Sequence, residues 1–416
     1  MPSPSALSPP ASRTPAGAGR QGNVVPFIRA TKKHREPFFD TTVAVTTTTA
    51  GLISPINVPA YGFLRGLWIR VDATGGAGGA AVYGTTLLGF DFPFQCISFI
   101  GLFDVNGAPL YGPFASAFQS YLIGKYGAYH RYFDARVGDA AAGGGTLQNA
   151  NGNFGFWLYV PVEAVRRNGL GSLANLNAAA TYKLQLTVSP IGAGGAQSNW
   201  FSTNPVTPPT GLRVRIWLDA WAQPPQADLL GNMTAQTPYA HGTTQFWSEQ
   251  VYTIGSGQQT VRLLRVGLYI RQLIVTVRQT TGARMITSQA ASDAMWPDPV
   301  QIFLDGFELV NQGQNMLWQE HYALWNVSPQ NIDGQAATVG SFLSGRDTSV
   351  YVFQFVDDDS AVLGNEERNR YLPTLQSSRL EIRGSFGAST ASLSVLTNDV
   401  APAGDIFVGT TENASI

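Results

Sequence analysis

LRGLWIRVDATGGAG (residues 64–78) and IRQLIVTVRQTTGAR (residues 270–284) are two stretches of the 416-residue chain that align without a gap. In each stretch an apolar, partly alternating segment runs into a loop that contains glycine, which is the pattern of a β-strand followed by a turn. The alignment therefore indicates that one strand-and-turn unit occurs twice. Six positions are identical between the copies: Arg65 and Arg271, Leu67 and Leu273, Val71 and Val277, Thr74 and Thr280, Gly76 and Gly282, Ala77 and Ala283.

Four further blocks recur in the same order along the chain. The turn in LFDVNGAPL (102–110) matches the turn in IFLDGFEL (302–309), which places Asn106-Gly107 on Asp305-Gly306. Both dipeptides favour tight turns with positive φ. The remaining pairs are QSYLIGKYGA (119–128) with QNMLWQEHYA (314–323), FWLYVP (156–161) with YVFQFV (351–356), and KLQL (183–186) with RLEI (379–382). The offsets of the five blocks (206, 199, 195, 195 and 196 residues) drift only as loop insertions would make them drift, so we predict an internal duplication.

Short strands dominate the chain from Glu36 onward, whereas residues 114–133 carry Phe118, Leu122 and Tyr126 at helical spacing. Strands this short need two packed sheets to bury their apolar faces, and a sandwich of about eight strands is most simply a jelly roll. We therefore predict an all-β fold of two tandem eight-stranded jelly-roll β-sandwiches with a short helix in each. The predicted boundaries are an N-terminal arm at 1–36, a first jelly roll at 37–222, a linker at 223–242, a second jelly roll at 243–400 and a C-terminal tail at 401–416.

The composition limits the possible functions. Hydrophobic residues make up 44% of the chain and charged residues only 13%, against about 25% in ordinary soluble proteins. A surface so poor in charge suggests that much of it is covered by other protein. The net charge of -1 gives no reason to expect nucleic-acid binding by the whole chain. The single cysteine, Cys96, excludes an intrachain disulfide and is expected to be a buried, inert thiol. No signal peptide or membrane span is expected.

The N-terminal arm is basic and contains no acidic residue before Glu36. Two interpretations are open: a solvated tail, or a contact with an anionic membrane surface or nucleic acid. The candidate contact residues are Arg13, Arg20, Arg29, Lys32, Lys33 and Arg35.

Sites for chemistry are not apparent. A metal-binding cupin needs clustered histidines, but no two of His34, His130, His241 and His321 are close in sequence. The run Asp357–Asp359, with Glu366 and Glu367 nearby, fits a solvated loop better than a glycosidase pair, and ion binding there is left open. The glycine loop at 75–79 is not followed by a lysine and a helix, as a phosphate loop would be. We expect no enzyme activity, no catalytic residue, no metal and no cofactor.

Two tandem jelly rolls behind a basic arm resemble the double-jelly-roll major capsid proteins of tectivirus-like phages and their adenovirus-type relatives, over about residues 37–400. The resemblance implies a structural subunit of an icosahedral virion, made in the host cytoplasm. It also implies homotrimers whose six jelly rolls form a pseudo-hexagonal capsomer. The implied partners are neighbouring capsomers, minor capsid and vertex proteins, and an internal membrane reached by the N-terminal arm.

The alternative is a carbohydrate- or receptor-binding β-sandwich module, because sandwiches host both functions and tryptophans are frequent in this chain. A sugar-binding surface would draw on aromatic side chains, but core and subunit interface are the more favoured places for them. The tryptophans concerned are Trp157, Trp217, Trp221, Trp247, Trp318 and Trp325.

Overall fold

The computed structural model describes most of the predicted strands. The described residues are 24–76, 91, 93–127, 129, 153–166, 168–193, 200–201, 204, 207–279, 299–313, 316, 328–332, 345–346, 350–356, 371–387 and 390–402.

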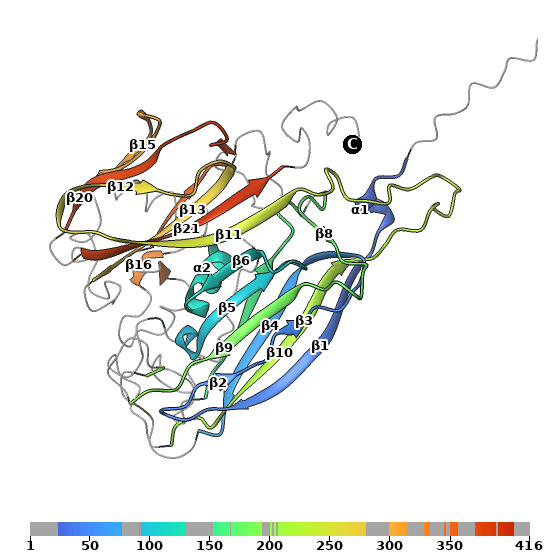
Figure 1. Ribbon diagram of the computed structural model, residues 1–416, viewed down its shortest axis with the longest axis horizontal. Coiled ribbons are helices and arrows are strands. Elements are labelled where there is room, and N and C mark those ends of the chain that lie inside the picture. The colour runs from blue at the N-terminus through green and yellow to red at the C-terminus, as the bar shows by residue number, and fades with distance from the viewer. Residues whose placement is uncertain are drawn as a thin grey trace, which may run out of the picture.

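The first unit consists of two facing sheets (Figure 1). One sheet has the strand order β1 (Lys33–Ala44), β10 (Gly211–Trp221), β4 (Phe63–Thr74), β7 (Gly155–Pro161), with the short β8 (Leu173–Ala174) beside β4. The other has the order β6 (Pro109–Phe114), β5 (Ile97–Phe103), β9 (Lys183–Val188), and β9 also pairs with β2 (Gly51–Leu52) and β3 (Ile56–Asn57).

The second unit repeats this arrangement. Its first sheet has the order β11 (Thr244–Thr253), β21 (Thr390–Ala401), β13 (Tyr269–Gln279), β18 (Val350–Gln354), with β19 (Leu372–Pro373) beside β13. Its second sheet has the order β15 (Phe307–Gln312), β14 (Val300–Leu304), β20 (Leu380–Phe386), β12 (Gly257–Leu263). The strands β16 (Ser328–Ile332) and β17 (Gly345–Arg346) form a separate parallel pair.

The two units have the same topology when their main strands are numbered from one to eight in chain order, with β2 and β3 taken together as the second strand. In each unit the first, eighth, third and sixth strands form one sheet, and the fifth, fourth, seventh and second form the other. Consecutive strands therefore lie in opposite sheets of the sandwich, except for the fourth and fifth, which form a hairpin within one sheet, as in a jelly roll. The predicted fold class is confirmed.

Four of the five repeat blocks lie on equivalent strands. Residues 64–78 and 270–284 begin in the third strands β4 and β13, and the other blocks lie at the fourth-to-fifth connection, the sixth strand and the seventh strand. The sixth strand needs a correction of register. Leu67 pairs with Val160, and its counterpart Leu273 pairs with Phe353, so Val160 corresponds to Phe353 and not to Phe355. A shift of two keeps side chains on the same face, which is why the apolar pattern did not reveal it.

The turns between the fourth and fifth strands differ in detail. Asp305 and Gly306 both have positive φ, 50° and 91°, as a two-residue hairpin turn requires. In the first unit only Gly107 has positive φ (89°), and Asp104 accepts hydrogen bonds from the backbone N–H groups of Asn106 and Ala108. The first unit therefore uses a longer loop at the same corner.

The short helices whose bounds lie within the described residues are α1 (Phe27–Ala30), the 3₁₀ turn η1 (Phe94–Cys96) and α2 (Ala117–Tyr126). Helix α2 begins at Ser116, whose hydroxyl oxygen accepts a hydrogen bond from the N–H of Phe118. Every residue of α2 except Lys125 is buried, as expected for a helix enclosed on all sides. The second predicted helix, at 314–323, lies outside the described residues except for Met316.

Each unit has its own apolar core, and the core of the first unit extends into the second. Strand β6 of the first unit pairs in parallel with β11 of the second at Tyr111 and Trp247, so that a single sheet runs through both units. Strand β13 is buried on both faces: Leu273, Val275 and Val277 point into the second unit's own core, whereas Ile274 packs with residues of the first unit. Helix α2 lies at this junction (Figure 1).

Candidate functional site

Two buried arginines occupy equivalent positions in the two units. Between β4 and β10, Gly66 pairs with Asp219 and Leu64 pairs with Ala220, so Arg65 is the extra residue of a β-bulge. Between β13 and β21, Arg271 is the extra residue of a bulge at the same place. The bulge turns each arginine inward, and the exposed fractions are only 4% for Arg65 and 0% for Arg271.

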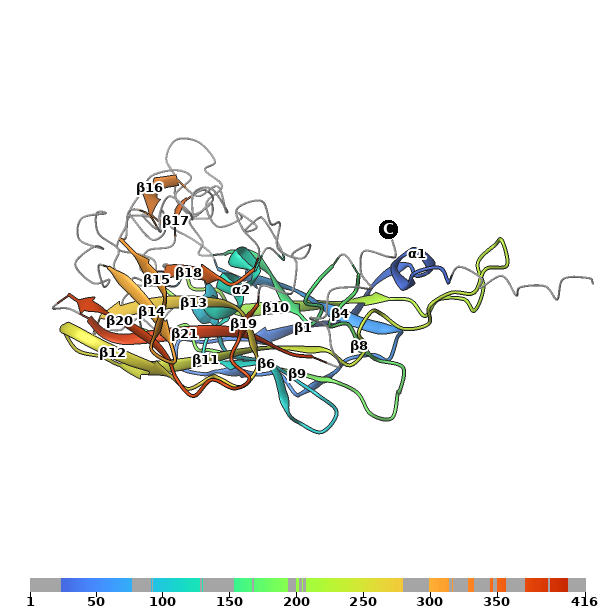
Figure 2. The same ribbon diagram turned by 90° about the horizontal axis from the view of Figure 1, so that it is seen from above.

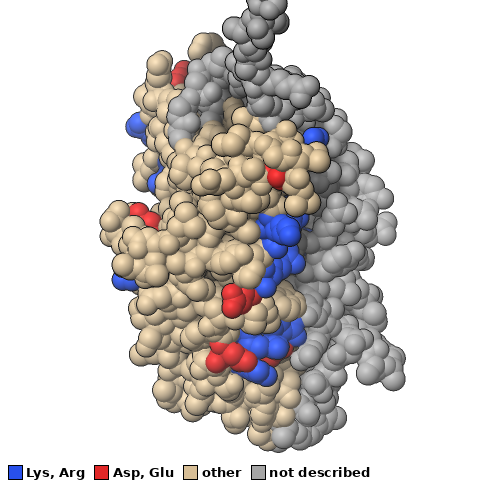
Figure 3. All heavy atoms as spheres, turned by 90° about the vertical axis from the view of Figure 1, so that its right-hand side faces the viewer, with Lys and Arg blue, Asp and Glu red and all other residues tan. Residues whose placement is uncertain are grey.

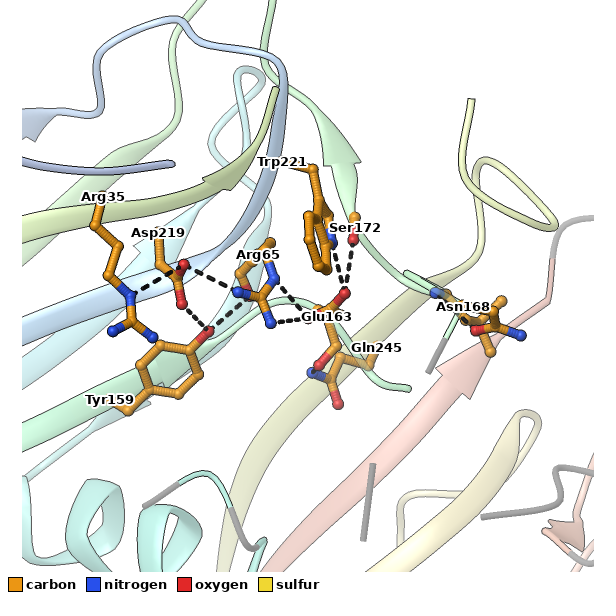
Figure 4. Close-up of polar contacts among 10 residues, drawn as sticks. Arg35, Arg65, Tyr159, Glu163, Asn168, Ser172, Asp219, Trp221 and Gln245 are labelled. Carbon is orange, nitrogen blue, oxygen red and sulfur yellow. Dashed lines mark hydrogen bonds and ion pairs between the residues drawn. The ribbon is translucent and has the colours of Figure 1, made fainter. Parts of the chain in front are cut away.

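Arg65 lies between two buried carboxylates (Figure 4). Its Nε and Nη2 each lie 2.8 Å from Oε2 of Glu163, and its Nη1 donates to Oδ1 of Asp219 at 3.0 Å. The indole Nε1 of Trp221 donates to Oε1 of Glu163 at 2.7 Å, and the Arg65 guanidinium carbon lies 4.3 Å from the Trp221 ring centroid. The hydroxyl of Tyr159 donates to Oδ2 of Asp219 at 3.4 Å.

The electrostatics of this cluster follow from burial and pairing. Burial disfavours the Arg65 charge, but Glu163 and the neighbouring acids outweigh that effect and hold the pKa of Arg65 above its usual value. Burial raises the pKa of Glu163, and attraction to Arg65 opposes that shift. The guanidinium therefore stays charged and depends on its carboxylates for solvation.

The cluster continues across the junction between the two units. The backbone oxygen of Glu163 accepts from Nε2 of Gln245 on β11 at 3.0 Å, and Oε1 of Gln245 accepts from Nδ2 of Asn398 on β21 at 3.1 Å. Asn398 in turn accepts through Oδ1 from Nη1 of Arg271 at 3.2 Å. One hydrogen-bonded chain thus links the two equivalent arginines. Buried polar networks of this kind fix the relative orientation of the parts that they join.

Helix α2 and its surroundings are also fastened to the second unit. The backbone oxygen of Tyr126 accepts from Nε2 of Gln272 at 2.9 Å, and Nε2 of Gln119 donates to Oε1 of Glu249 at 3.0 Å. Arg278 forms a 2.8 Å ion pair with Asp91. Apolar and polar contacts therefore both join the two units at this junction. These contacts hold the two sandwiches against each other at the junction.

The candidate residues of the predicted basic arm lie in different parts of the structure. Arg29 lies in α1, and β1 begins at Lys33, within the segment predicted to precede the first jelly roll. Lys33 lies over the Trp221 ring, and Nε of Arg35 lies 3.5 Å from Oδ1 of Asp219. Lys32 is exposed between α1 and β1, whereas Arg13 and Arg20 lie outside the described residues.

The surface at this side of the molecule carries both signs of charge. Figure 3 shows Lys and Arg atoms close to Asp and Glu atoms, within a described surface that is mostly neither. One exposed pair is Arg213 with Asp40. On the described part of this face the two signs of charge are interleaved, so this part forms no extended basic patch.

The other sequence candidates are placed as follows. Cys96 is fully buried, and burial raises the pKa of its thiol well above the usual value. Trp221 and Trp247 are buried at 4% and 1% exposure, so neither offers a ring face to a sugar. Among the described residues no group of three His, Cys, Asp or Glu side chains could hold a metal ion, and no helix is long and apolar enough to span a membrane. Asp357–Asp359, Glu366, Glu367, Trp318 and Trp325 lie outside the described residues.

Sequence reasoning missed the polar partners at the junction, namely Glu163, Asp219, Gln245 and Asn398. The available signal was the identity of Arg65 and Arg271 within otherwise apolar strands. A charged residue repeated in a buried strand needs a partner.

Comparison with known proteins gives matches in structure only, since no protein-family model and no curated protein matches this sequence. The chain is similar to the STIV MCP, with a TM-score of 0.56 and 14% identity over 91% of this chain and 100% of that one. A chain in the atomic structure of Sulfolobus turreted icosahedral virus matches with a TM-score of 0.53 and 15% identity, over 89% and 91% of the two chains. The major capsid protein P2 of bacteriophage PM2 matches with a TM-score of 0.45 and 9% identity, over 90% and 99%. The first two matches show that nearly the whole chain has the double-jelly-roll fold.

Proposed function

We propose that this chain is a non-enzymatic structural subunit that self-assembles into the shell of an icosahedral virus, as a major capsid protein. The observation that carries the proposal is the buried junction between two jelly rolls of the same topology, in a chain whose fold covers the whole of the STIV MCP. A pair of equivalent sandwiches supplies two of the six blocks of a pseudo-hexagonal ring, so three chains complete it. A surface poor in charge suits extensive burial against neighbours.

The proposed assembly is a homotrimer that packs against neighbouring capsomers in the virion. Minor capsid and vertex proteins are further proposed partners, and synthesis in the host cytoplasm follows from the same assignment. The carbohydrate- or receptor-binding alternative would instead predict a chain that binds glycans without assembling.

Assembly of the purified chain tests the function directly. We expect light scattering to give a trimer mass that persists on dilution, because obligate interfaces bury more than about 2,000 Å² in total. Electron microscopy should then show particles with hexagonal outlines. A stable monomer that forms no larger particle would contradict the proposed function, and specific glycan binding by that monomer would favour the alternative.

We further propose that the end of the molecule bearing the basic arm contacts a membrane. In Figures 1 and 2, α1 and the connection between β10 and β11 project beyond the sheets at the same end. This connection carries Leu229, Leu230 and Met233, with exposed fractions of 105%, 86% and 61%. It is tied to the arm, since the N–H of Val25 donates to the backbone oxygen of Met233 at 2.9 Å.

A fixed turn holds these apolar side chains outward. Oδ1 of Asp228 accepts from the N–H groups of Leu230 and Asn232 at 2.9 and 2.8 Å, and Gly231 has a φ of 81°. The connection itself contains no lysine or arginine, so the basic charge at this end of the molecule comes from the arm. Exposed apolar side chains combined with basic residues are typical of segments that enter the membrane interface.

Vesicle flotation tests the membrane contact. The full chain should float with vesicles that contain phosphatidylglycerol, and Leu229→Ser/Leu230→Ser should weaken binding at least about tenfold, because each buried leucine contributes about 1.5–3 kcal/mol. Leu52→Ser, at a site that is 81% exposed elsewhere, is the matched control. Removing residues 1–22, which leaves α1 and β1 in place, should also reduce flotation. Flotation that neither change reduces would rule out this contact.

A further inference from the structure

The junction inside the chain shows which surface of one jelly roll packs against the other. In the second unit, the first sheet turns one face away from its own core and buries it against the first unit. The residues on this face are nearly inaccessible, with exposed fractions of 0% for Ile274, 1% for Val350, 4% for Val352 and 1% for Leu396. At the same junction the edge strand β11 of this sheet meets the edge strand β6 of the first unit.

The strand register identifies the equivalent face of the first unit. Ile274 pairs with Leu396 and Val352, and the equivalent residue Trp68 pairs with Trp217 and Tyr159. By the same register Thr276 pairs with Val350, and Arg70 pairs with Trp157. Four apolar residues that the second unit buries at the junction therefore correspond to three tryptophans and a tyrosine in the first unit.

These aromatic residues form a continuous surface, which we call the aromatic face and define as Trp68, Trp157 and Trp217. The ring centroids of Trp157 and Trp217 are 4.9 Å apart, and those of Trp68 and Trp157 are 6.3 Å apart. Each tryptophan is partly exposed, and arginine guanidinium groups lie near the rings (Arg35 over Trp68, Arg70 over Trp157, Arg215 over Trp217). Tryptophan, tyrosine and arginine are the residues most enriched where protein interfaces derive their affinity.

The pair of edge strands that meet at the internal junction has an equivalent pair elsewhere in the molecule. The internal junction joins the fifth-strand edge of the first unit, β6, to the first-strand edge of the second unit, β11. The fifth strand of the second unit, β15, and the first strand of the first unit, β1, each lie at the end of a sheet. They lie at opposite ends of the molecule in Figure 1 and cannot meet within one chain. Strand β15 exposes Phe307 (77%) and Leu309 (40%).

We propose that the aromatic face and β1 bind the second unit of another copy of this chain, along its strand β15. The contact repeats between copies the junction that already exists within the chain. It is heterologous, since two different surfaces meet, and contacts of this kind close into rings or continue as filaments. This inference rests on the proposed self-assembly and specifies the surface that it uses.

Substitutions on the two sides of the contact test it. Phe307→Asp places a charge on an exposed residue of β15, and Trp157→Ser/Trp217→Ser removes the centre of the aromatic face. Each variant should raise the dissociation constant of the oligomer at least about tenfold, as loss of an interface hot spot does. Leu264→Asp, at a position with 69% exposure outside both surfaces, should leave it unchanged. Light scattering over a dilution series gives the constants, and circular dichroism checks that each variant is folded.

Mixing the two variants distinguishes a heterologous contact from other arrangements. The Phe307→Asp chain keeps its aromatic face, and the tryptophan variant keeps β15, so one intact contact forms between them and the mixture should give heterodimers that do not close. If the wild-type protein and both variants assemble equally well, this inference is wrong, whereas the proposed function is unaffected. Wild-type protein that never assembles would remove the proposed function itself.

Discussion

Replacing Arg65 by methionine should lower the free energy of unfolding by about 3–5 kcal/mol, the range found when one partner of a buried ion pair is removed. Methionine fills much of the arginine's volume, so the expected loss comes mainly from charge and not from a cavity. Glu163 and Asp219 would remain buried at 2% exposure each, Glu163 without its cation and Asp219 with only Arg35, at 3.5 Å. Urea denaturation followed by tryptophan fluorescence measures the change.

Two further variants test whether the loss of stability comes from the buried charges and not simply from removing an arginine. Arg213→Met breaks the pair between Arg213 and Asp40, whose side chains are 46% and 50% exposed, and should cost far less stability than Arg65→Met because solvent screens this pair. Adding Glu163→Gln and Asp219→Asn to Arg65→Met should recover much of the lost stability, because the uncompensated charges are then removed. An Arg65→Met chain as stable as Arg213→Met would contradict the role assigned to the cluster.

The fold was largely predictable because it depends on patterns that are local in sequence. Alternation along β10 places Val214, Ile216 and Leu218 in the core, and the ordered recurrence of blocks indicated the duplication. The start of β1 was missed because Lys33–Pro37 is charged and contains proline, whereas an edge strand tolerates both.

The junction was not predictable from sequence because its partners come from distant strands. Arg65 meets Glu163 and Asp219, 98 and 154 residues away, and nothing in the local pattern of those residues marks them as a cluster. From the sequence, Trp157 and Trp217 were expected in the core or at a subunit interface, and Trp68 was not singled out. Their common face became visible once the strand register placed Trp68 opposite both Tyr159 and Trp217.

Replacing Ile274 by alanine should destabilise both units together, by about 2–5 kcal/mol. Ile274 belongs to β13 of the second unit, but its side chain is fully buried in the core formed mainly by the first unit. A cavity at this place removes contacts from both units, so the denaturation midpoints reported by the two units should fall by the same amount. Hydrogen exchange of β10 in the first unit and β20 in the second measures each unit separately.

The matched control for this change is Leu264→Ala, which truncates an apolar side chain of the second unit that is 69% exposed and should change stability by less than about 0.5 kcal/mol. If Ile274→Ala lowered protection in β20 while β10 stayed protected, the units would unfold independently and the junction would not couple them. A coupled loss would instead show that the junction joins the two sandwiches into one cooperative unit, because removing one side chain at the junction would then lower the stability of both.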